Sequence, residues 1–236
     1  MEWISCTLKS DTGRFTVPYS TGYQTYSGLL SLIGKTDTQL ADEVHDTSFA
    51  SLTNSGLLGS FDWETNREYR KAIDADSEYE LRVGVTHPDD EAVFNALIKA
   101  LVINDSSLEL ADGSLRMTSV ETKTQTHTEV LSDAADSIKD GASGVEIQFE
   151  TPTCCNRYGD VWEAHPDRIN LFQSLADRWN ATTTEEQQIA LEDGALGKDL
   201  FTVADTKQYE THSIVVHRRE PKQADSNTGD RNAATI

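Results

Sequence analysis

His45 is the residue whose type and position in this sequence best suit proton chemistry. It lies at the end of the segment TDTQLADEVHD (residues 36–46), just before a stretch rich in Ser and Thr. An imidazole titrates near neutral pH and can act as an acid or as a base. At the end of a helix, the dipole and the carboxylates of Asp42, Glu43 and Asp46 would favour its protonated form. The position therefore favours a proton donor, although His45 could also cap the helix or fill a gap in a core.

A second candidate site lies near the end of the chain, in KQYETHSIVVHRR (residues 207–219). This stretch is the densest basic and aromatic cluster of an acidic sequence, and a strand with such side chains suits phosphates and stacked bases. The alternative is that alternation simply places them on a solvated face. The members are Lys207, Tyr209, His212, His217, Arg218 and Arg219, and Arg157 in CCNRYG is a further candidate for a phosphate contact.

The sequence predicts neither a metal site nor a cofactor. Cys154 and Cys155 are adjacent and lack the C-x-x-C spacing of zinc and thioredoxin sites. No glycine loop for nucleotides, nucleophile elbow or H-E-x-x-H helix occurs. His87 and His165 each precede a proline and are expected to be structural, and His127 has no evident partner.

Two helices are expected to position His45. The chain begins with a strand at residues 3–10, and a Pro-containing loop then leads into a helix within residues 14–34. A short second helix over residues 36–46 would start with a capping box formed by Thr36 and Gln39. The residues that the first helix is expected to turn toward the core are Tyr23, Tyr26, Leu30 and Ile33. Those of the second helix are Leu40, Ala41 and Val44.

The following segments complete a βαββαβ order. The stretch at residues 49–61 reads as a strand, and residues 79–87 alternate apolar and polar side chains as a half-buried strand does. Residues 88–105 are the clearest amphipathic helix, and residues 107–124 form a strand pair around Asp112-Gly113. This order through residue 126 is that of a ferredoxin-like, split βαβ domain.

The second half repeats the start of the first. Residues 144–152 alternate Val145, Ile147 and Phe149 as a strand, residues 165–180 read as a helix, and HSIVVHR (residues 212–218) is another strand. The predicted fold class is therefore α+β, with tandem ferredoxin-like units of which the second is incomplete. The expected divisions are a first unit at 1–128, a linker at 129–143, a second unit at 144–219 and a mobile polar tail at 220–236.

The net charge points to an unusual solvent. Forty Asp and Glu residues against 20 Lys and Arg give −20, and the acids are spread along the whole chain. Such a surface repels itself in dilute buffer, whereas at about 1 M salt the Debye length falls to roughly 3 Å and the repulsion is screened. We therefore expect a halophilic protein of a salt-loaded cytoplasm. Under that screening, an acidic total does not exclude a polyanionic partner.

Membrane and secreted classes fit the sequence poorly. No apolar run approaches the roughly 20 residues that a membrane span needs. The start, MEWISCTLKS, lacks the basic region and apolar stretch of a signal peptide. With three cysteines a disulfide framework is not expected. These features predict a cytoplasmic location and no membrane partner.

Several stretches, taken in order, resemble the Cas-six family of CRISPR-associated endoribonucleases, members of the RAMP superfamily that cut the repeat-spacer transcript into guide RNAs. The resemblance covers roughly residues 15–220 and suggests a haloarchaeal type. Its motifs are FTVPYSTGYQTYSGLLSLIGKTDTQLADEVHD, SLTNSGLLGSF, GVEIQFETPTCCNRYG and LFQSLADRWN. The family is built from two ferredoxin-like units, in agreement with the order of strands and helices read from the residues.

The resemblance implies a reaction without metal or other cofactor. In this family the ribose 2′-hydroxyl attacks the adjacent phosphate and expels the 5′-oxygen, which leaves a 2′,3′-cyclic phosphate. His45 stands where several members carry their catalytic histidine. Ser31 stands where some members place a tyrosine, a role that Tyr26 or Tyr23 could take over, and no lysine follows His45 closely. The implied partners are CRISPR repeat RNA and other subunits of a CRISPR effector complex.

Two alternatives stay open beside the nuclease. Members of the family usually end with a glycine-rich loop and a final strand, which the end of this sequence, EPKQADSNTGDRNAATI, does not match. This difference makes a truncated or non-catalytic RNA-binding scaffold of the same superfamily the main alternative. A halophilic protein of unrelated function on the same fold is the other, because a fold alone fixes no activity.

Overall fold

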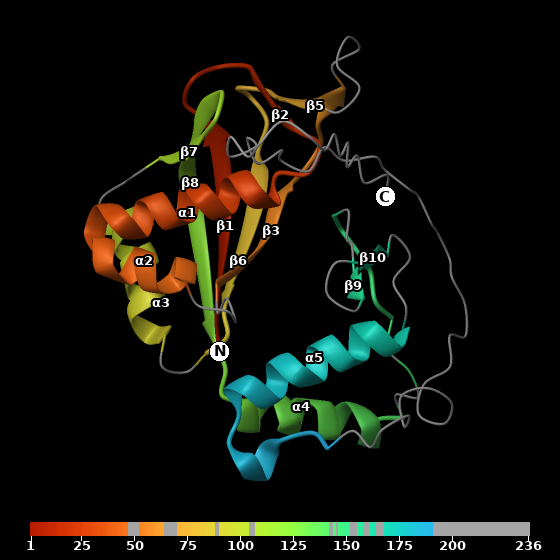
Figure 1. Cartoon of the computed structure of the whole chain (residues 1–236). Coiled ribbons are helices and arrows are strands. Elements are labelled where there is room, and N and C mark those ends of the chain that lie inside the picture. Colours follow the sequence, from red (N-terminus) through yellow and green to blue (C-terminus); the bar gives the residue numbers. More distant parts are fainter. Residues whose placement is uncertain are drawn as a thin grey trace, which may run out of the picture.

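A five-stranded antiparallel sheet forms the centre of the computed structural model (Figure 1). Its strand order is β3-β6-β1-β8-β7. The strands are β1 (Glu2–Ser10), β3 (Leu52–Leu58), β6 (Tyr79–Val85), β7 (Leu108–Leu110) and β8 (Gly113–Thr124). The residues that the structure describes are 1–46, 52–63, 70–87, 90–103, 107–141, 144, 146–151, 155–157, 161–163 and 168–190.

Helices of the first half lie against this sheet. Figure 1 shows α1 (Gly22–Thr36) crossing one face, with α2 (Thr38–Asp46) and α3 (Glu91–Ile98) beside it. A π-helical turn, η2 (Lys99–Ile103), extends α3. The chain crosses from β1 to β3 through α1 and α2, and from β6 to β7 and β8 through α3. In the sheet, β1 and β6 are therefore neighbours, with β3 and β8 outside them. This arrangement is the split βαβ order, so the α+β class and the order predicted through residue 126 are confirmed.

The core forms between the sheet and these helices because apolar side chains recur with the period of each element. In β1, alternate residues are buried, namely Ile4, Cys6 and Leu8, and β6 buries Tyr79, Leu81, Val83 and Val85. Helix α1 contributes Leu29, Leu32 and Ile33, and α3 contributes Val93, Ala96 and Leu97. Burial raises the pKa of the Cys6 thiol to about 12, so this cysteine is inert at neutral pH.

A second, three-stranded sheet has the order β2-β5-β4 and was not predicted. It consists of β2 (Phe15–Pro18), β4 (Asp62–Trp63) and β5 (Arg70–Ile73). In its register Val17 lies opposite Lys71, and Asp62 lies opposite Ala72. This sheet brings β5 next to the segment that enters α1.

Two details of the first helices differ from the prediction. Helix α1 continues to Thr36, and Asp37 accepts the backbone N–H of Leu40 at 3.1 Å, so the predicted capping box of Thr36 and Gln39 is wrong. A carboxylate at this position satisfies a free N–H of the first turn of α2. Tyr23 was expected in the core but is 67% exposed, because two residues turn a helix by about 200° and Tyr23 therefore lies on the side of α1 opposite the buried Thr25.

The second half contains a helix where a linker was expected. Helix α4 (His127–Lys139) occupies most of residues 129–143 and starts with a capping box between Thr126 and Glu129, but it buries no residue. Helix α5 (Arg168–Thr182) confirms the helix expected in residues 165–180. The other elements are β9 (Cys155–Arg157), β10 (Val161–Glu163) and the 3-10 turn η3 (Glu185–Gln187).

The strand predicted at residues 144–152 is wrong. Residues 146–150 form neither helix nor strand, and Ile147 and Phe149 are 42% and 41% exposed. Their alternation finds no neighbouring strand in the described part of the chain, so no ladder forms. The strand expected at 212–218 and the tail at 220–236 lie outside the described residues. The tandem arrangement and its boundaries therefore stay predictions.

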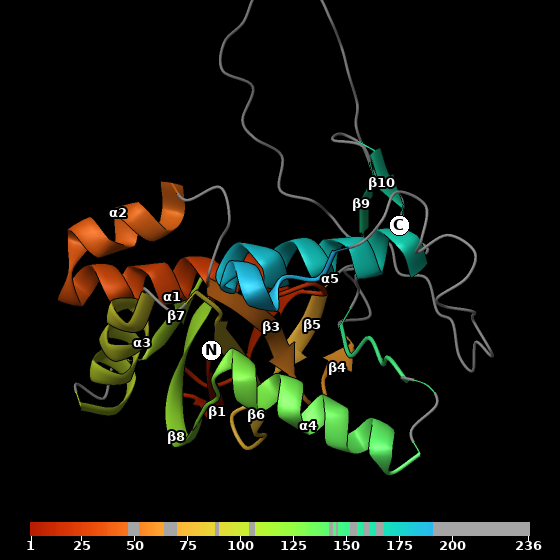
Figure 2. The same cartoon turned by 90° about the horizontal axis from the view of Figure 1, so that it is seen from below.

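The start of α4 packs against the end of α5 (Figure 2). The ring of His127 meets the indole of Trp179 edge-on at 5.0 Å, and its Nε2 lies 3.2 Å from the hydroxyl of Thr182. Gln187 of η3 donates to Thr128 at 3.0 Å. His127, which had no evident partner in the sequence, therefore joins two helices that are more than 25 residues apart in the chain.

We expect this contact to weaken in acid. Partial burial holds the pKa of His127 below its usual value of 6.5, and the chain's amino terminus acts in the same direction. Since the unfolded chain then binds more protons, the free energy of unfolding is highest above pH 6.5 and falls as the pH drops from there through the folded-state pKa. Urea unfolding at about pH 7.5 and pH 5.5 in concentrated KCl measures this loss. His127→Phe should show a smaller loss than the wild type; an equal loss would contradict the role of His127.

Candidate functional site

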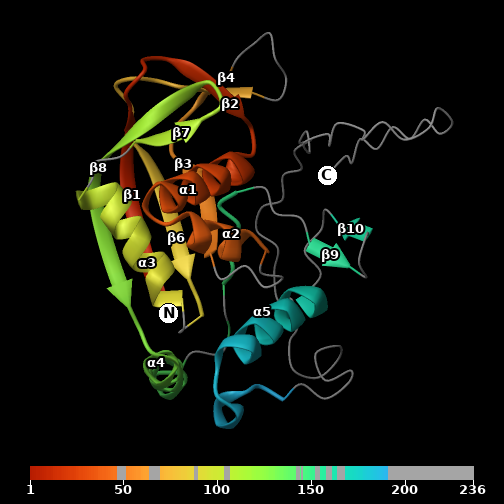
Figure 3. The ribbon, with the colours of Figure 1, turned by 60° about the vertical axis from the view of Figure 1, so that its left-hand side comes forward.

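His45 is carried by a helical hairpin. One residue, Asp37, separates α1 from α2, which doubles back alongside it (Figure 3). The apolar face predicted for α2 holds it there, because Val44 is buried and Leu40 and Ala41 pack against the core. The position of His45 therefore depends on the packing of α2 against α1 and the sheet.

The imidazole of His45 lies on the outer side of this hairpin. His45 is exposed, although the preceding Val44 is buried, and it lies in the last turn of α2. The gap-filling role in a core is thus excluded. Within the described residues the ring makes no hydrogen bond or ion pair, so it neither caps α2 nor has its donor occupied. It is accessible to a ligand at the negative end of the helix dipole.

Tyr26 and Ser31 both belong to α1 but face different sides. Tyr26 packs against the core, and burial raises the pKa of its phenol, so the group holds its proton at neutral pH. Ser31 is exposed. Five residues on a helix turn by about 140°, which prevents the two from pointing the same way. Among the described contacts no hydrogen bond joins either of them to His45.

The predicted RNA-binding residues lie almost entirely outside the described part of the chain. This is true of Lys207, Tyr209, His212, His217, Arg218 and Arg219. Arg157 is the last residue of β9 and pairs with Val161 of β10. All seven stay predictions. In the described ranges, no group of three or more His, Cys, Asp or Glu side chains could hold a metal ion, and none of the helices found there is long and apolar enough to cross a bilayer.

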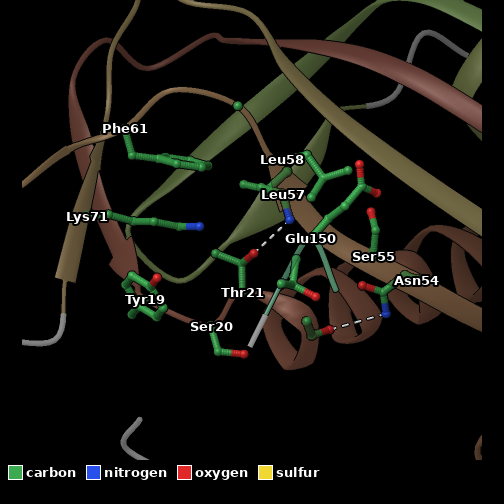
Figure 4. Close-up of a pocket in the computed structure, with 13 residues that line it drawn as sticks. Tyr19, Ser20, Thr21, Asn54, Ser55, Leu57, Leu58, Phe61, Lys71 and Glu150 are labelled. Carbon is green, nitrogen blue, oxygen red and sulfur yellow. Dashed lines mark hydrogen bonds between the residues drawn. The ribbon is translucent and has the colours of Figure 1, made fainter. Parts of the chain in front are cut away.

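A cavity of about 400 Å³ opens at the N-terminus of α1 and was not foreseen (Figure 4). Its walls come from the segment 19–22 that enters α1, from residues 54–55 and 57–59 at the end of β3, and from Phe61. Lys71 of β5 and residues 150–151 complete the lining. These segments are distant in sequence, so the cavity exists only once the two sheets and α1 have assembled.

Lys71 is the unusual residue of this cavity. Its side chain is buried with 8% exposure, and Nζ lies 3.6 Å from the centre of the Phe61 ring and 5.8 Å from that of Tyr19. Phe61 itself stacks on Tyr79 at 5.1 Å. Burial lowers the pKa of the ammonium group to about 8, although the ring faces favour the cation. Among the described residues it has no carboxylate partner and no hydrogen bond.

The floor of the cavity is fixed by hydrogen bonds between α1 and β3. The Thr21 hydroxyl accepts the N–H of Leu57 at 2.7 Å. The Asn54 side-chain oxygen accepts from the Thr25 hydroxyl at 2.6 Å and from the N–H of Gly56 at 2.8 Å. Gly56 has φ +66° and a Cβ there would lie 2.9 Å from the Thr21 oxygen, so only glycine fits this close approach.

Glu150, the carboxylate at the rim of the cavity, is paired with a cation. Glu150 accepts a hydrogen bond from Arg82 at 2.5 Å, and the same guanidinium binds Glu80 at 2.7 Å. Helix α1 has no acidic residue in its first turn, although the chain has 40 of them. The N-terminal end of α1 thus keeps the positive potential of its dipole. Sequence reasoning missed this site because Lys71 precedes Ala72 and Ile73 in an ordinary-looking short strand.

Comparisons with known proteins point to one kind of fold. No family model matches the chain, and no curated protein matches it. Among solved structures, a Cas6-related protein from Pyrococcus furiosus superposes with a TM-score of 0.50 and 10% identity, over 76% of this chain and 70% of that one. A Cas6 product complex, from T. thermophilus, superposes with a TM-score of 0.50 and 16% identity, over 77% of this chain and 66% of that one. The chain therefore shares the fold of Cas6 proteins.

Proposed function

We propose that the protein binds CRISPR repeat RNA and cuts it as a metal-independent endoribonuclease. The observation that carries the proposal is His45, an accessible imidazole without a structural partner in the described residues, at the end of α2 in a chain with the fold of Cas6 proteins. The resemblance seen in the sequence assigns the catalytic histidine to this position. One of the two solved structures is a Cas6 bound to its product.

The proposed reaction has one proton transfer at each oxygen. The ribose 2′-oxygen forms a bond to phosphorus as its proton passes to a base or to water, and the bond from phosphorus to the 5′-oxygen breaks. His45 gives its proton to the departing 5′-oxygen, a role that the C-terminal end of α2 favours. The products are a 2′,3′-cyclic phosphate and a 5′-hydroxyl, and no metal takes part.

Two further groups, on different sides of α1, are candidates for the proposed site. The hydroxyl of Ser31, exposed on α1, would donate a hydrogen bond to the substrate. Tyr26 would stay a neutral donor, because burial raises the pKa of its phenol. The basic residues at 207–219 and Arg157 would hold the phosphates of the RNA, and the second ferredoxin-like unit expected from residue 144 onward would contribute to the binding surface. With a net charge of −20, RNA binding and RNA cleavage would both take place in a salt-loaded cytoplasm.

Cleavage of labelled repeat RNA tests the proposal. The protein is incubated with RNA of its host's CRISPR repeat and with a scrambled RNA, in EDTA and concentrated KCl. We expect one cut in the repeat RNA only, with a cyclic phosphate detected by mass spectrometry. A repeat RNA with a single 2′-deoxy nucleotide at the cut should stay intact. Cleavage of that RNA, or a need for divalent metal, would overturn the mechanism.

A second candidate function is a non-catalytic RNA-binding subunit of the same superfamily. It is favoured by the separation of Tyr26 and Ser31 on α1, and by the lack of a hydrogen bond from either to His45 among the described residues. Specific binding of the repeat RNA without cleavage, measured by electrophoretic mobility in the same salt, supports this function over the nuclease.

A further inference from the structure

We propose that the cavity at the N-terminus of α1 binds the phosphate group of a nucleotide, with Lys71 as the cation that pairs with it. The nucleotide is either free or one residue of an RNA chain, and both present the same phosphate. In the second case the site would serve the proposed function, but binding of a free nucleotide does not depend on RNA cleavage. The cavity is separate from His45, which is not among its lining residues.

The first argument is the burial of a charge without a counter-charge. A lysine with 8% exposure is expected to have a carboxylate partner. Lys71 has none in the described structure, where its ammonium meets only the faces of Phe61 and Tyr19. The position of the amino group, directed into the cavity toward Thr21 in Figure 4, leaves its N–H groups available to an anion.

The second argument is the direction of the field at this end of α1. Helix α1 is 15 residues long, has no acid in its first turn, and its N-cap residue Thr21 makes no side-chain cap hydrogen bond. The Thr21 hydroxyl accepts from Leu57 and donates to no described acceptor, so its hydrogen is available too. A helix N-terminus and a cation on the same cavity form an anion site. The carboxylate of Glu150 at the rim is paired with Arg82 and opposes this field only weakly.

The size and chemistry of the cavity select a nucleotide among anions. A volume of about 400 Å³ is larger than a bare phosphate needs and suits a small organic ligand. The Ser20 hydroxyl, which makes no hydrogen bond among the described residues, can recognise a hydroxyl or a base edge there, whereas the Asn54 and Ser55 side chains already donate to Gly22 and Gly56 (Figure 4). The walls are fixed by the Thr21 and Asn54 hydrogen bonds, so the cavity does not have to form around its ligand.

Proton uptake on binding provides a direct test. The pKa of Lys71 is about 8, so near pH 8 half of the molecules carry a neutral amine, while AMP is fully ionised. A phosphate bound beside the amine favours the ammonium form, so the amine of Lys71 takes up a proton when the ligand binds. Calorimetric titration of the full chain with AMP, in buffers of different ionisation enthalpy, should show an uptake approaching about half a proton per site. Adenosine should neither bind nor cause uptake.

Two lysine variants separate a binding role from a structural one. Lys71→Met keeps an unbranched side chain against Phe61 and should weaken AMP binding by about 10- to 100-fold, the usual effect of a charged hydrogen bond, and abolish the proton uptake. The matched control is Lys35→Met, at the opposite, exposed end of α1, which should leave both unchanged. Circular dichroism of both variants confirms that they fold.

The ligand arms distinguish the sources of the phosphate. Inorganic phosphate, AMP and a short single-stranded RNA are titrated into the wild type and Lys71→Met. Binding of AMP that depends on Lys71 identifies a free nucleotide, and such dependence for the RNA alone identifies a nucleotide within a chain; both support the site. If no arm depends on Lys71, or if adenosine binds as well as AMP, the site is disproved. Because His45→Ala leaves the lysine intact, loss of cleavage in that variant does not affect this result.

Discussion

His45→Ala is expected to abolish RNA cleavage while RNA binding persists. A positioned acid or base contributes about 10²- to 10⁴-fold to a rate, so cleavage of repeat RNA should slow by that factor. The imidazole is exposed and makes no hydrogen bond, ion pair or ring contact with the described residues, so its removal should change the free energy of unfolding by less than about 0.5 kcal/mol. Single-turnover cleavage and electrophoretic mobility, measured at the same KCl concentration, give the two quantities separately.

His127→Ala is the matched control, because it also removes an imidazole, but one that has a structural role between α4 and α5. That imidazole packs on Trp179 and bonds Thr182, so this variant should lose stability and keep its cleavage rate once folded. Added imidazole should restore part of the activity of His45→Ala, because the position is open to solvent, and should do nothing for His127→Ala. A His45→Ala protein that cleaves within about threefold of the wild type would contradict the assigned role.

The first half of the fold follows from the sequence because its elements carry strong periodic patterns. The stripe of α3 and the alternation of β6 each indicate one face to bury, and the structure buries them. The helix α4 was missed because it buries nothing: its few large apolar residues, such as Leu131 and Ile138, are exposed, and only the Thr126 capping box marks its start. Conversely, Ile147 and Phe149 alternate like a strand, but a strand also needs a partner, which a pattern does not show.

The His45 site and the Lys71 cavity also differ in how far the sequence predicts them. The helix end that carries His45 is a local feature, so its exposure next to the buried Val44 could be expected from the pattern of α2. The Lys71 cavity is a tertiary feature, formed where β5 of the small sheet meets the start of α1. The residues next to Lys71 in the sequence do not predict that its charge is buried, because Phe61 and Tyr19 contact it from other segments. The cluster at 207–219 is known from its composition alone.

Leu29→Ala should cause the largest loss of stability of the variants considered. Leu29 has 0% exposure in α1, the helix that packs against α2, α3 and β3, so truncation leaves a cavity that these neighbours cannot fill. Such a change lowers the free energy of unfolding by about 2–5 kcal/mol. Urea unfolding in concentrated KCl measures it, with Leu131→Ala, 41% exposed on α4, as a control that should cost under about 1 kcal/mol.

The same substitution should disturb both candidate sites at once. Helix α1 supports α2, which carries His45, and its N-terminus forms one wall of the Lys71 cavity. Partial unfolding by Leu29→Ala should therefore lower RNA cleavage and AMP binding in proportion to the loss of folded protein, and a midpoint shift in urea should predict both. Equal stability of Leu29→Ala and Leu131→Ala would show that the interface beneath α1 is not the structural support assigned to it.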